Sequence, residues 1–200
     1  MMHEAGTASE QTRERLLNAA REEFSQHGFQ GATVREICRR AETNVAAVNY
    51  HFGSKDGLLA EALNFAPLKA MQLANDKADK NPEVRLRLFI RDFMLMLLDE
   101  TNGSLPCRIM ARELADPTPA LDKIVREAIA PLHEFLGELL REIAGEKTGE
   151  AELRRCVHSI LGQCLYYRHS HPVQQRLHPK LRYDHKEIAA VAKHIADFSL

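Results

Sequence analysis

The 200-residue sequence predicts an all-α protein, and three observations support this fold class. Apolar residues recur with helical spacing along most of the chain, while no segment alternates convincingly with the two-residue period of a strand. Capping residues precede several of these stretches, and glycine or proline follows many of them. We expect an N-terminal three-helix head containing a helix-turn-helix over residues 1–63, joined to a larger α-helical body over residues 64–200.

The first helix of the head should begin near Thr7 or Ser9, since either side chain can cap it. Its apolar stripe consists of Leu16, Leu17, Ala20 and Phe24. Gly28 stands where a left-handed residue commonly terminates a helix. We therefore expect the first helix to end at this glycine.

Two short helices should follow, separated by a polar turn. Thr33 and Glu36 form a capping box for the first of them. Asn44 caps the second, which is expected over residues 45–51, and Ser54 caps the next helix. This layout is that of a helix-turn-helix, although its spacing alone fits an ordinary helical hairpin equally well.

The body should begin after a kink at Ala66–Pro67, because proline removes a helical hydrogen bond. Its helices are expected over about residues 82–100, 106–115, 118–144, 151–168 and 186–198. The first is apolar almost all round, which predicts a buried central helix ending at Asn102–Gly103. Pro131 should kink the third, and residues 169–183 should be irregular apart from one turn at Val173–Leu177. The helix at 151–168 has two apolar faces, which predicts a second subunit as one of its partners.

Net charge does not mark the head as a nucleic-acid-binding domain. The chain has a formal net charge of −1, and the first 56 residues contain seven Lys or Arg against eight Asp or Glu. Any contact with DNA must therefore come from local placement of charge. No membrane-length apolar run or signal peptide is present, and the four cysteines form no disulfide pattern. We expect a cytoplasmic protein with no membrane partner.

The chemistry of the second short helix favours DNA reading over a plain hairpin. Ala46 and Ala47 are small enough to approach base edges, and Asn49 can pair bidentately with adenine. The far end of this helix and the start of the next carry side chains suited to phosphate oxygens, namely Tyr50, His51 and Lys55.

Many positions in register resemble the DNA-binding head of TetR-type bacterial regulators. They are Phe24, Gly28, Gly31, Ala32-Thr33-Val34, Ile37, Ala41 and Tyr50-His51-Phe52-Gly53-Ser54-Lys55. The resemblance implies a homodimeric regulator whose C-terminal body holds a small-molecule pocket and the dimer interface. It implies phosphate contacts by Thr33, Tyr50, His51 and Lys55. It also implies base contacts by Arg35 and by the start of the recognition helix, Val45, Ala46 and Ala47. Asn44, which caps this helix, is a further candidate DNA-binding residue.

Three residues depart from that pattern. Glu42 replaces the usual turn glycine, so the turn lacks glycine's freedom at positive φ. Asn49 stands where many members carry tyrosine, and Cys38 replaces a common alanine. In the body, residues 112–120 and 162–168 are similar to the CecR-type C-terminal domain.

An adaptable apolar effector pocket could be built from methionine and aromatic residues of the body. The candidate apolar residues are Phe93, Met94, Leu97 and Met110. The candidate polar residues that would orient a ligand are Arg112, Glu113, Gln163 and Tyr166. Plain hydrophobic core and structural hydrogen-bond networks remain the alternatives for each of them.

Other chemistries find little support. The His169-Ser170-His171 run matches no metal-ligand spacing, and Cys107 and Cys164 fall on apolar faces where thiols are usually inert. No catalytic motif occurs, so we expect no enzyme and no cofactor.

The prediction is a ligand-responsive transcriptional repressor. It should bind an inverted-repeat DNA operator as a homodimer, paired through helices near 151–168 and 186–198, and a small-molecule effector should release it. The alternatives are a helical ligand-binding or interaction protein without sequence-specific DNA binding, or a regulator triggered by thiol oxidation or metal.

Overall fold

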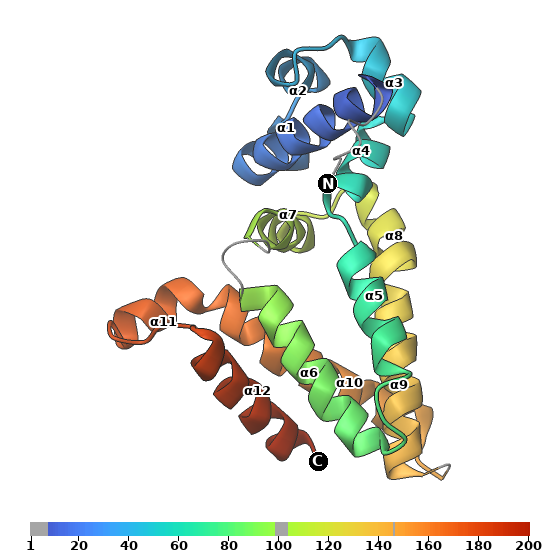
Figure 1. Cartoon of the computed structure of the whole chain (residues 1–200), viewed down its shortest axis with the longest axis vertical. Coiled ribbons are helices and arrows are strands. Elements are labelled where there is room, and N and C mark those ends of the chain that lie inside the picture. The colour runs from blue at the N-terminus through green and yellow to red at the C-terminus, as the bar shows by residue number, and fades with distance from the viewer. Residues whose placement is uncertain (1–7, 99–103, 146) are drawn as a thin grey trace, which may run out of the picture. The chain divides into compact units, whose positions relative to one another are not determined.

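The computed structural model describes residues 8–98, 104–145 and 147–200. Every regular element in these ranges is helical, so the predicted all-α fold is confirmed (Figure 1). The chain divides into two compact units: residues 1–65 with 105–125, and residues 66–104 with 126–200. The division near residue 65 lies close to the boundary that we predicted between residues 63 and 64. The first unit also takes in residues 105–125, from the part expected to form the body.

The first unit contains six helices in its described part. They are α1 (Ala8–Gly31), α2 (Val34–Arg40), α3 (Val45–Phe52), α4 (Lys55–Ala62), α7 (Ser104–Ala115) and α8 (Ala120–Ile124). α1 packs against α2, α3 and α4, and α4 also packs against α8. Side chains with no exposure fill the space between them, among them Leu16, Phe24, Ile37 and Leu58. This core holds the two short helices of the head in place.

The first helical segment of α1 ends at Gly28, as predicted. Its φ of +68° and ψ of −178° interrupt the helix, and one further turn then reaches Gly31. The predicted end of the first helix at Gly28 is therefore confirmed, and a short second segment continues to Gly31 beyond the kink. At the other end, α1 already includes Ser9, so Ser9 is not its cap, and Thr7 lies outside the described residues.

The caps predicted for the next three helices are all present. The side chains of Thr33, Asn44 and Ser54 each accept a hydrogen bond from the backbone N–H three residues on, at 3.1 Å. α4 ends at Ala62, and Asn64, with φ +48°, separates it from α5. The expected kink at Ala66–Pro67 is therefore a break between two helices.

The second unit is built around α6 (Pro82–Leu98). The helices that pack against it are α5 (Ala66–Asn75), α9 (Ala130–Ala144), α10 (Glu150–His169) and α12 (His185–Ser199). Leu86, Phe89, Ile90 and Met94 of α6 have no exposed surface, which confirms the predicted buried central helix. Its expected end at Asn102–Gly103 lies outside the described residues. None of the helices in the described parts of the chain is long and apolar enough to cross a membrane.

Two stretches of the body differ from expectation. The single helix predicted over 118–144 is instead α8, a π-helical turn at Val125–Ile129, and α9. Pro131 explains the interruption, because it has no N–H to donate to the carbonyl of Glu127 and its ring crowds that carbonyl. The region 169–183, expected to be irregular apart from one turn at Val173–Leu177, contains that turn within a longer helix, α11 (His171–Leu177).

Candidate functional site

The α2–turn–α3 segment presents one face of α3 outward from the first unit. Val48 and Phe52 are buried on its inner side, whereas Asn49 and Tyr50 are exposed. Gly57 of α4 allows close contact at the end of α3, because a Cβ there would lie 2.1 Å from the Phe52 carbonyl oxygen. Sequence reasoning missed this glycine, since its need arises from packing between α3 and α4. The tight packing of the buried side of α3 thus fixes which side of this helix faces outward.

The turn between α2 and α3 adopts a left-handed conformation at Glu42, with φ +52°. This is the position at which the sequence lacks the family's glycine, so the glutamate adopts an unfavourable backbone conformation. Buried Cys38 helps to close the turn, because its Sγ donates to the Asn44 carbonyl at 3.4 Å. Burial raises the pKa of this thiol.

Two of the three arginines of α2 are held by carboxylates of the protein. Arg39 donates to both carboxylate oxygens of Glu36, at 2.8 and 2.6 Å. Arg40 lies 3.3 Å from Glu36 and 3.2 Å from the buried carboxylate of Glu23, which ties α2 to α1. Hydrogen bonding from Arg39, with help from Arg40, lowers the pKa of Glu36 to about 2. Arg35 is exposed and forms no ion pair within the described residues, so its guanidinium remains available to a ligand.

The residues predicted to read bases lie at the start and along the outer face of α3. Val45, Ala46 and Asn49 are exposed, and Ala47 is half-buried. Asn44 is exposed too, but its side-chain oxygen already caps α3 by accepting from Ala47 N–H. Its amide nitrogen keeps two N–H donors for a further contact.

The predicted phosphate contacts have different surroundings. Thr33 is exposed at the start of α2, and its hydroxyl accepts from Glu36 N–H while keeping its own proton to donate. Tyr50 is 81% exposed, and its ring meets that of half-buried His51 edge-on at 4.9 Å. A tyrosine so exposed contributes little to the core and is free to contact a partner.

Lys55, at the first position of α4, is partly engaged inside the unit. Its ammonium donates to the Phe29 carbonyl and lies 4.3 Å from the centre of the Phe29 ring. Desolvation lowers the pKa of this lysine. The ammonium has three N–H donors, so the bond to Phe29 leaves others for a phosphate.

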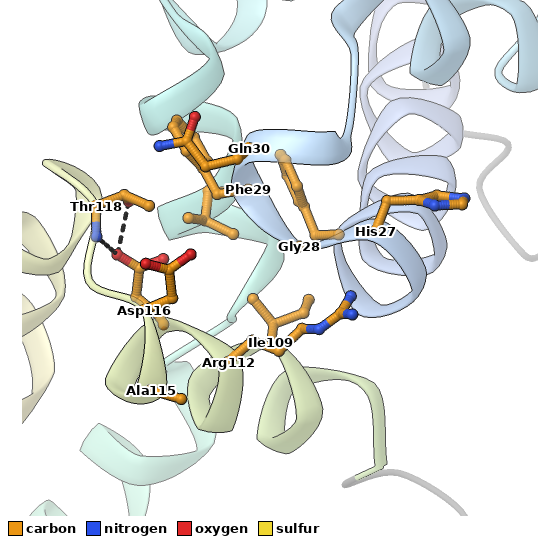
Figure 2. Close-up of a pocket in the computed structure, with 12 residues that line it drawn as sticks. His27, Gly28, Phe29, Gln30, Ile109, Arg112, Ala115, Asp116 and Thr118 are labelled. Carbon is orange, nitrogen blue, oxygen red and sulfur yellow. Dashed lines mark hydrogen bonds between the residues drawn. The ribbon is translucent and has the colours of Figure 1, made fainter.

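A pocket of about 300 Å³ lies within the first unit, between the bend of α1, α4 and the end of α7 (Figure 2). Phe24, Phe29, Leu59 and Ile109 supply apolar surface. Its polar lining includes His27, Arg112, Glu113, Asp116 and Thr118. The buried Glu113 carboxylate accepts from Thr118 N–H at 2.7 Å and from its hydroxyl at 2.6 Å.

The predicted effector residues fall in both units. Arg112 and Glu113 line the pocket of the first unit, and Met110 is half-buried on the same helix, α7. The other five belong to the second unit. Phe93, Met94 and Leu97 are buried in α6. Gln163 donates to Ser199 at 3.4 Å, and Tyr166 is 61% exposed.

The alternatives based on thiols and metals gain no support from the geometry. Burial raises the pKa of Cys164 to about 12, which keeps it a thiol at neutral pH. The ring of His171 packs on that of Tyr183 at 5.3 Å. Among the described residues, no group of three or more potential metal ligands gathers. The Cys107 side chain lies outside the described part.

The fold and the exposed face of α3 define a helix-turn-helix DNA-binding regulator with a helical second unit. Residues 16–62 match the family model for bacterial regulatory proteins of the TetR family. Residues 82–200 match the model for the C-terminal domain of the HTH-type transcriptional dual regulator CecR. The chain belongs to the TetR family, with a C-terminal domain of the CecR type. It is a transcriptional regulator and not an enzyme.

Named relatives and solved structures agree with this assignment. The chain is 41% identical over 144 residues to the HTH-type transcriptional regulator UidR of Escherichia coli K12, covering 71% of each protein. It is 29% identical over 171 residues to the dual regulator CecR of Shigella flexneri, covering 80% of this chain and 76% of that protein. The crystal structure of AibR with isovaleryl coenzyme A and operator DNA has the same fold. Its TM-score is 0.69, at 18% identity over 93% of this chain and 97% of that one.

Proposed function

We propose that the protein is a repressor that binds an inverted-repeat operator as a homodimer and leaves it when a small molecule binds. The observation that carries the DNA-binding part is the outer face of α3, where Asn49 and Tyr50 are exposed over the buried Val48 and Phe52. A helix presented in this way can enter the major groove, with Asn49 facing bases and Tyr50 near phosphates. Such a protein would act in the bacterial cytoplasm, where its operator lies.

The first test is an electrophoretic mobility shift on DNA from upstream of the protein's own coding sequence. We expect a specific complex, and Tyr50→Ala should weaken it at least several-fold without lowering the melting temperature, because Tyr50 lies outside the core. Gln26→Ala, at an exposed position of α1, is the control and should bind normally. If no DNA segment competes better than random DNA, the proposed function is wrong.

The outer face of α10 supports a homodimer. Cys156, Ser159, Gly162 and Tyr166 lie along one side of this helix and are all exposed, opposite the buried Leu153, Val157 and Cys164. α12 packs against α10, and its Phe198 is 76% exposed. Small residues let two copies of a helix approach closely, and exposed aromatic side chains add apolar surface to bury.

Gly162 offers a sharp test of this interface. A Cβ at Gly162 would have no atom within 4 Å, so a large side chain fits the isolated subunit. Gly162→Arg should therefore convert a dimer into folded monomers by analytical ultracentrifugation. Gly149→Arg, at a glycine with equally open surroundings, should remain dimeric. A wild-type monomer at micromolar concentration, or a dimeric Gly162→Arg variant, would exclude this face.

Effector control completes the proposal. AibR, which has the same fold, was solved with both an acyl coenzyme A and operator DNA, which supports control of this kind of regulator by a small molecule. In this chain, a ligand would release DNA only if it bound more tightly to a state whose two heads do not match the operator spacing.

A further inference from the structure

The pocket in the first unit carries opposite charges on residues that do not pair with each other. Arg112 and Asp116 stand four residues apart at the end of α7, a spacing at which opposite charges commonly form an ion pair. They form none here, nor does either with any other described residue. In Figure 2 the Arg112 guanidinium points toward Gly28 and His27, whereas Asp116 lies at the other end of the pocket beside Thr118.

Arg112 has unused hydrogen-bonding capacity. Its Nη1 donates to the Ser25 carbonyl at 3.3 Å. The Gly28 backbone lies beside it, at a residue with no side chain to cover the guanidinium. A guanidinium carries five N–H donors in a planar fork that matches a carboxylate. One end of the pocket is therefore suited to an anionic group.

The opposite end is suited to a cation. Glu113 is buried, and one of its carboxylate oxygens is taken by the two bonds from Thr118. Asp116 is exposed at the rim, and its backbone N–H continues α7 by donating to the Arg112 carbonyl at 2.9 Å. This end of the pocket therefore has two carboxylates, and no cation among the described residues pairs with either. Such a pair favours a ligand that donates hydrogen bonds and carries positive charge.

Between the two ends the lining is apolar. Phe24 and Phe29 stack with ring centroids 6.1 Å apart, and Leu59 and Ile109 are buried beside the pocket. A volume of about 300 Å³ suits a molecule the size of an amino acid. We propose that this pocket binds a small zwitterion with an apolar body, such as an apolar amino acid, with its carboxylate toward Arg112 and its ammonium toward Asp116.

Binding at this site would bear directly on DNA recognition. Phe29 lines the pocket and also holds the Lys55 ammonium through its carbonyl and ring. A ligand that moved Phe29 would change how Lys55 is presented. This regulatory consequence rests on the proposed function, whereas ligand binding itself does not.

Isothermal titration calorimetry on the full chain, without DNA, tests the binding step. The probes are L-leucine and L-phenylalanine, each with the deaminated acid and the decarboxylated amine that match it. At least one amino acid should bind, and its two singly charged analogues should each bind at least about tenfold more weakly, because each has lost one charge-assisted contact. Absence of binding for every probe, or equal affinity for an amino acid and its analogues, would overturn the proposal.

Two substitutions assign the ends of the pocket. Arg112→Met should remove the preference for the amino acid over the decarboxylated amine, because the group that binds the carboxylate is gone. Asp116→Asn should remove the preference for the amino acid over the deaminated acid, because the group that binds the ammonium is gone. Asp116 is exposed, so its variant should fold even if Arg112→Met disturbs the contact with α1. An unchanged preference in folded Asp116→Asn would overturn the assigned orientation.

A separate mobility shift with and without the bound probe tests regulation. A change in operator affinity supports the link through Phe29, and an unchanged affinity excludes that link while leaving the ligand site in place. Failure of the chain to bind any operator would concern the proposed function alone, because calorimetry measures the ligand without DNA.

Discussion

Replacing Lys55 with methionine would separate the two roles that the structure gives this lysine. Methionine keeps an unbranched apolar stem of similar length but removes the ammonium. Inside the first unit, the ammonium donates to the Phe29 carbonyl and lies over the Phe29 ring. On DNA, the resemblance to TetR-type heads implies that the same group contacts a phosphate.

The magnitude of each effect follows from these contacts. A hydrogen bond from a charged donor contributes roughly 1.5–3 kcal/mol, and a partly exposed cation–π contact about 0.5–1 kcal/mol. Because Lys55 is only half-buried, Lys55→Met should lower the free energy of unfolding by about 2 kcal/mol. On DNA, each lost phosphate contact reduces the dependence of log K on log salt by about 0.9, so a homodimer should lose about 1.8.

The assay is operator binding by fluorescence anisotropy from 50 to 200 mM salt, with urea unfolding of the same samples. Over this range, a slope reduced by 1.8 makes the salt-induced loss of affinity roughly tenfold smaller than in the wild type. Phe29→Leu is the matched control, because it removes the ring but keeps the carbonyl and every charge, and its slope should equal that of the wild type. If Lys55→Met keeps the wild-type slope, Lys55 contacts no phosphate and serves only to hold Phe29.

Three further substitutions and one pH titration test the rest of the reading surface. Asn49→Ala should alter base preference at one operator position in a binding-site selection, and a uniform loss across sequences would exclude base reading. Glu42→Gly should raise the free energy of unfolding by about 0.5–1 kcal/mol by relieving the left-handed residue, whereas Glu42→Ala should give no such gain. Gly57→Ala should lower it by about 1–3 kcal/mol, because the added Cβ would collide with the Phe52 carbonyl. The folded-state pKa of Glu36 lies below its ordinary value of 4.5, at about 2, so its contribution to stability is complete above pH 4.5 and is lost as the pH falls toward 2. Acid unfolding followed by circular dichroism should show that Glu36→Gln lacks the loss of stability that the wild type undergoes between pH 4.5 and 2. An identical pH profile for both proteins would contradict this role of Glu36.

The helices of the head were predictable because their start signals are local. Thr33, Asn44 and Ser54 each bond to an amide only three residues away, so side-chain type and spacing were enough to place α2, α3 and α4. Periodicity likewise predicted α6 as the central helix of its unit. A helix cap or an apolar stripe can be recognised from the sequence, because neither depends on which residues lie across the core.

The pocket could not be predicted in the same way. Periodicity indicates that Phe93 or Met94 is buried, but not whether it faces a cavity or a neighbouring helix. The contacts that shape the pocket join distant parts of the chain, such as Arg112 to the Ser25 carbonyl. The bond between Lys55 and Phe29 spans 26 residues and involves a backbone oxygen, which no side-chain pattern reveals.

The shared position of Phe29 constrains how this regulator can diverge. A substitution that reshaped the pocket for a new ligand would also alter the support beneath Lys55, so ligand specificity and operator affinity cannot vary independently at this residue. Engineers who wish to change the ligand alone should begin with Ile109 or Asp116, which line the pocket, instead of Phe29, which holds Lys55. Libraries randomised at residue 29 should instead return variants altered in both properties at once.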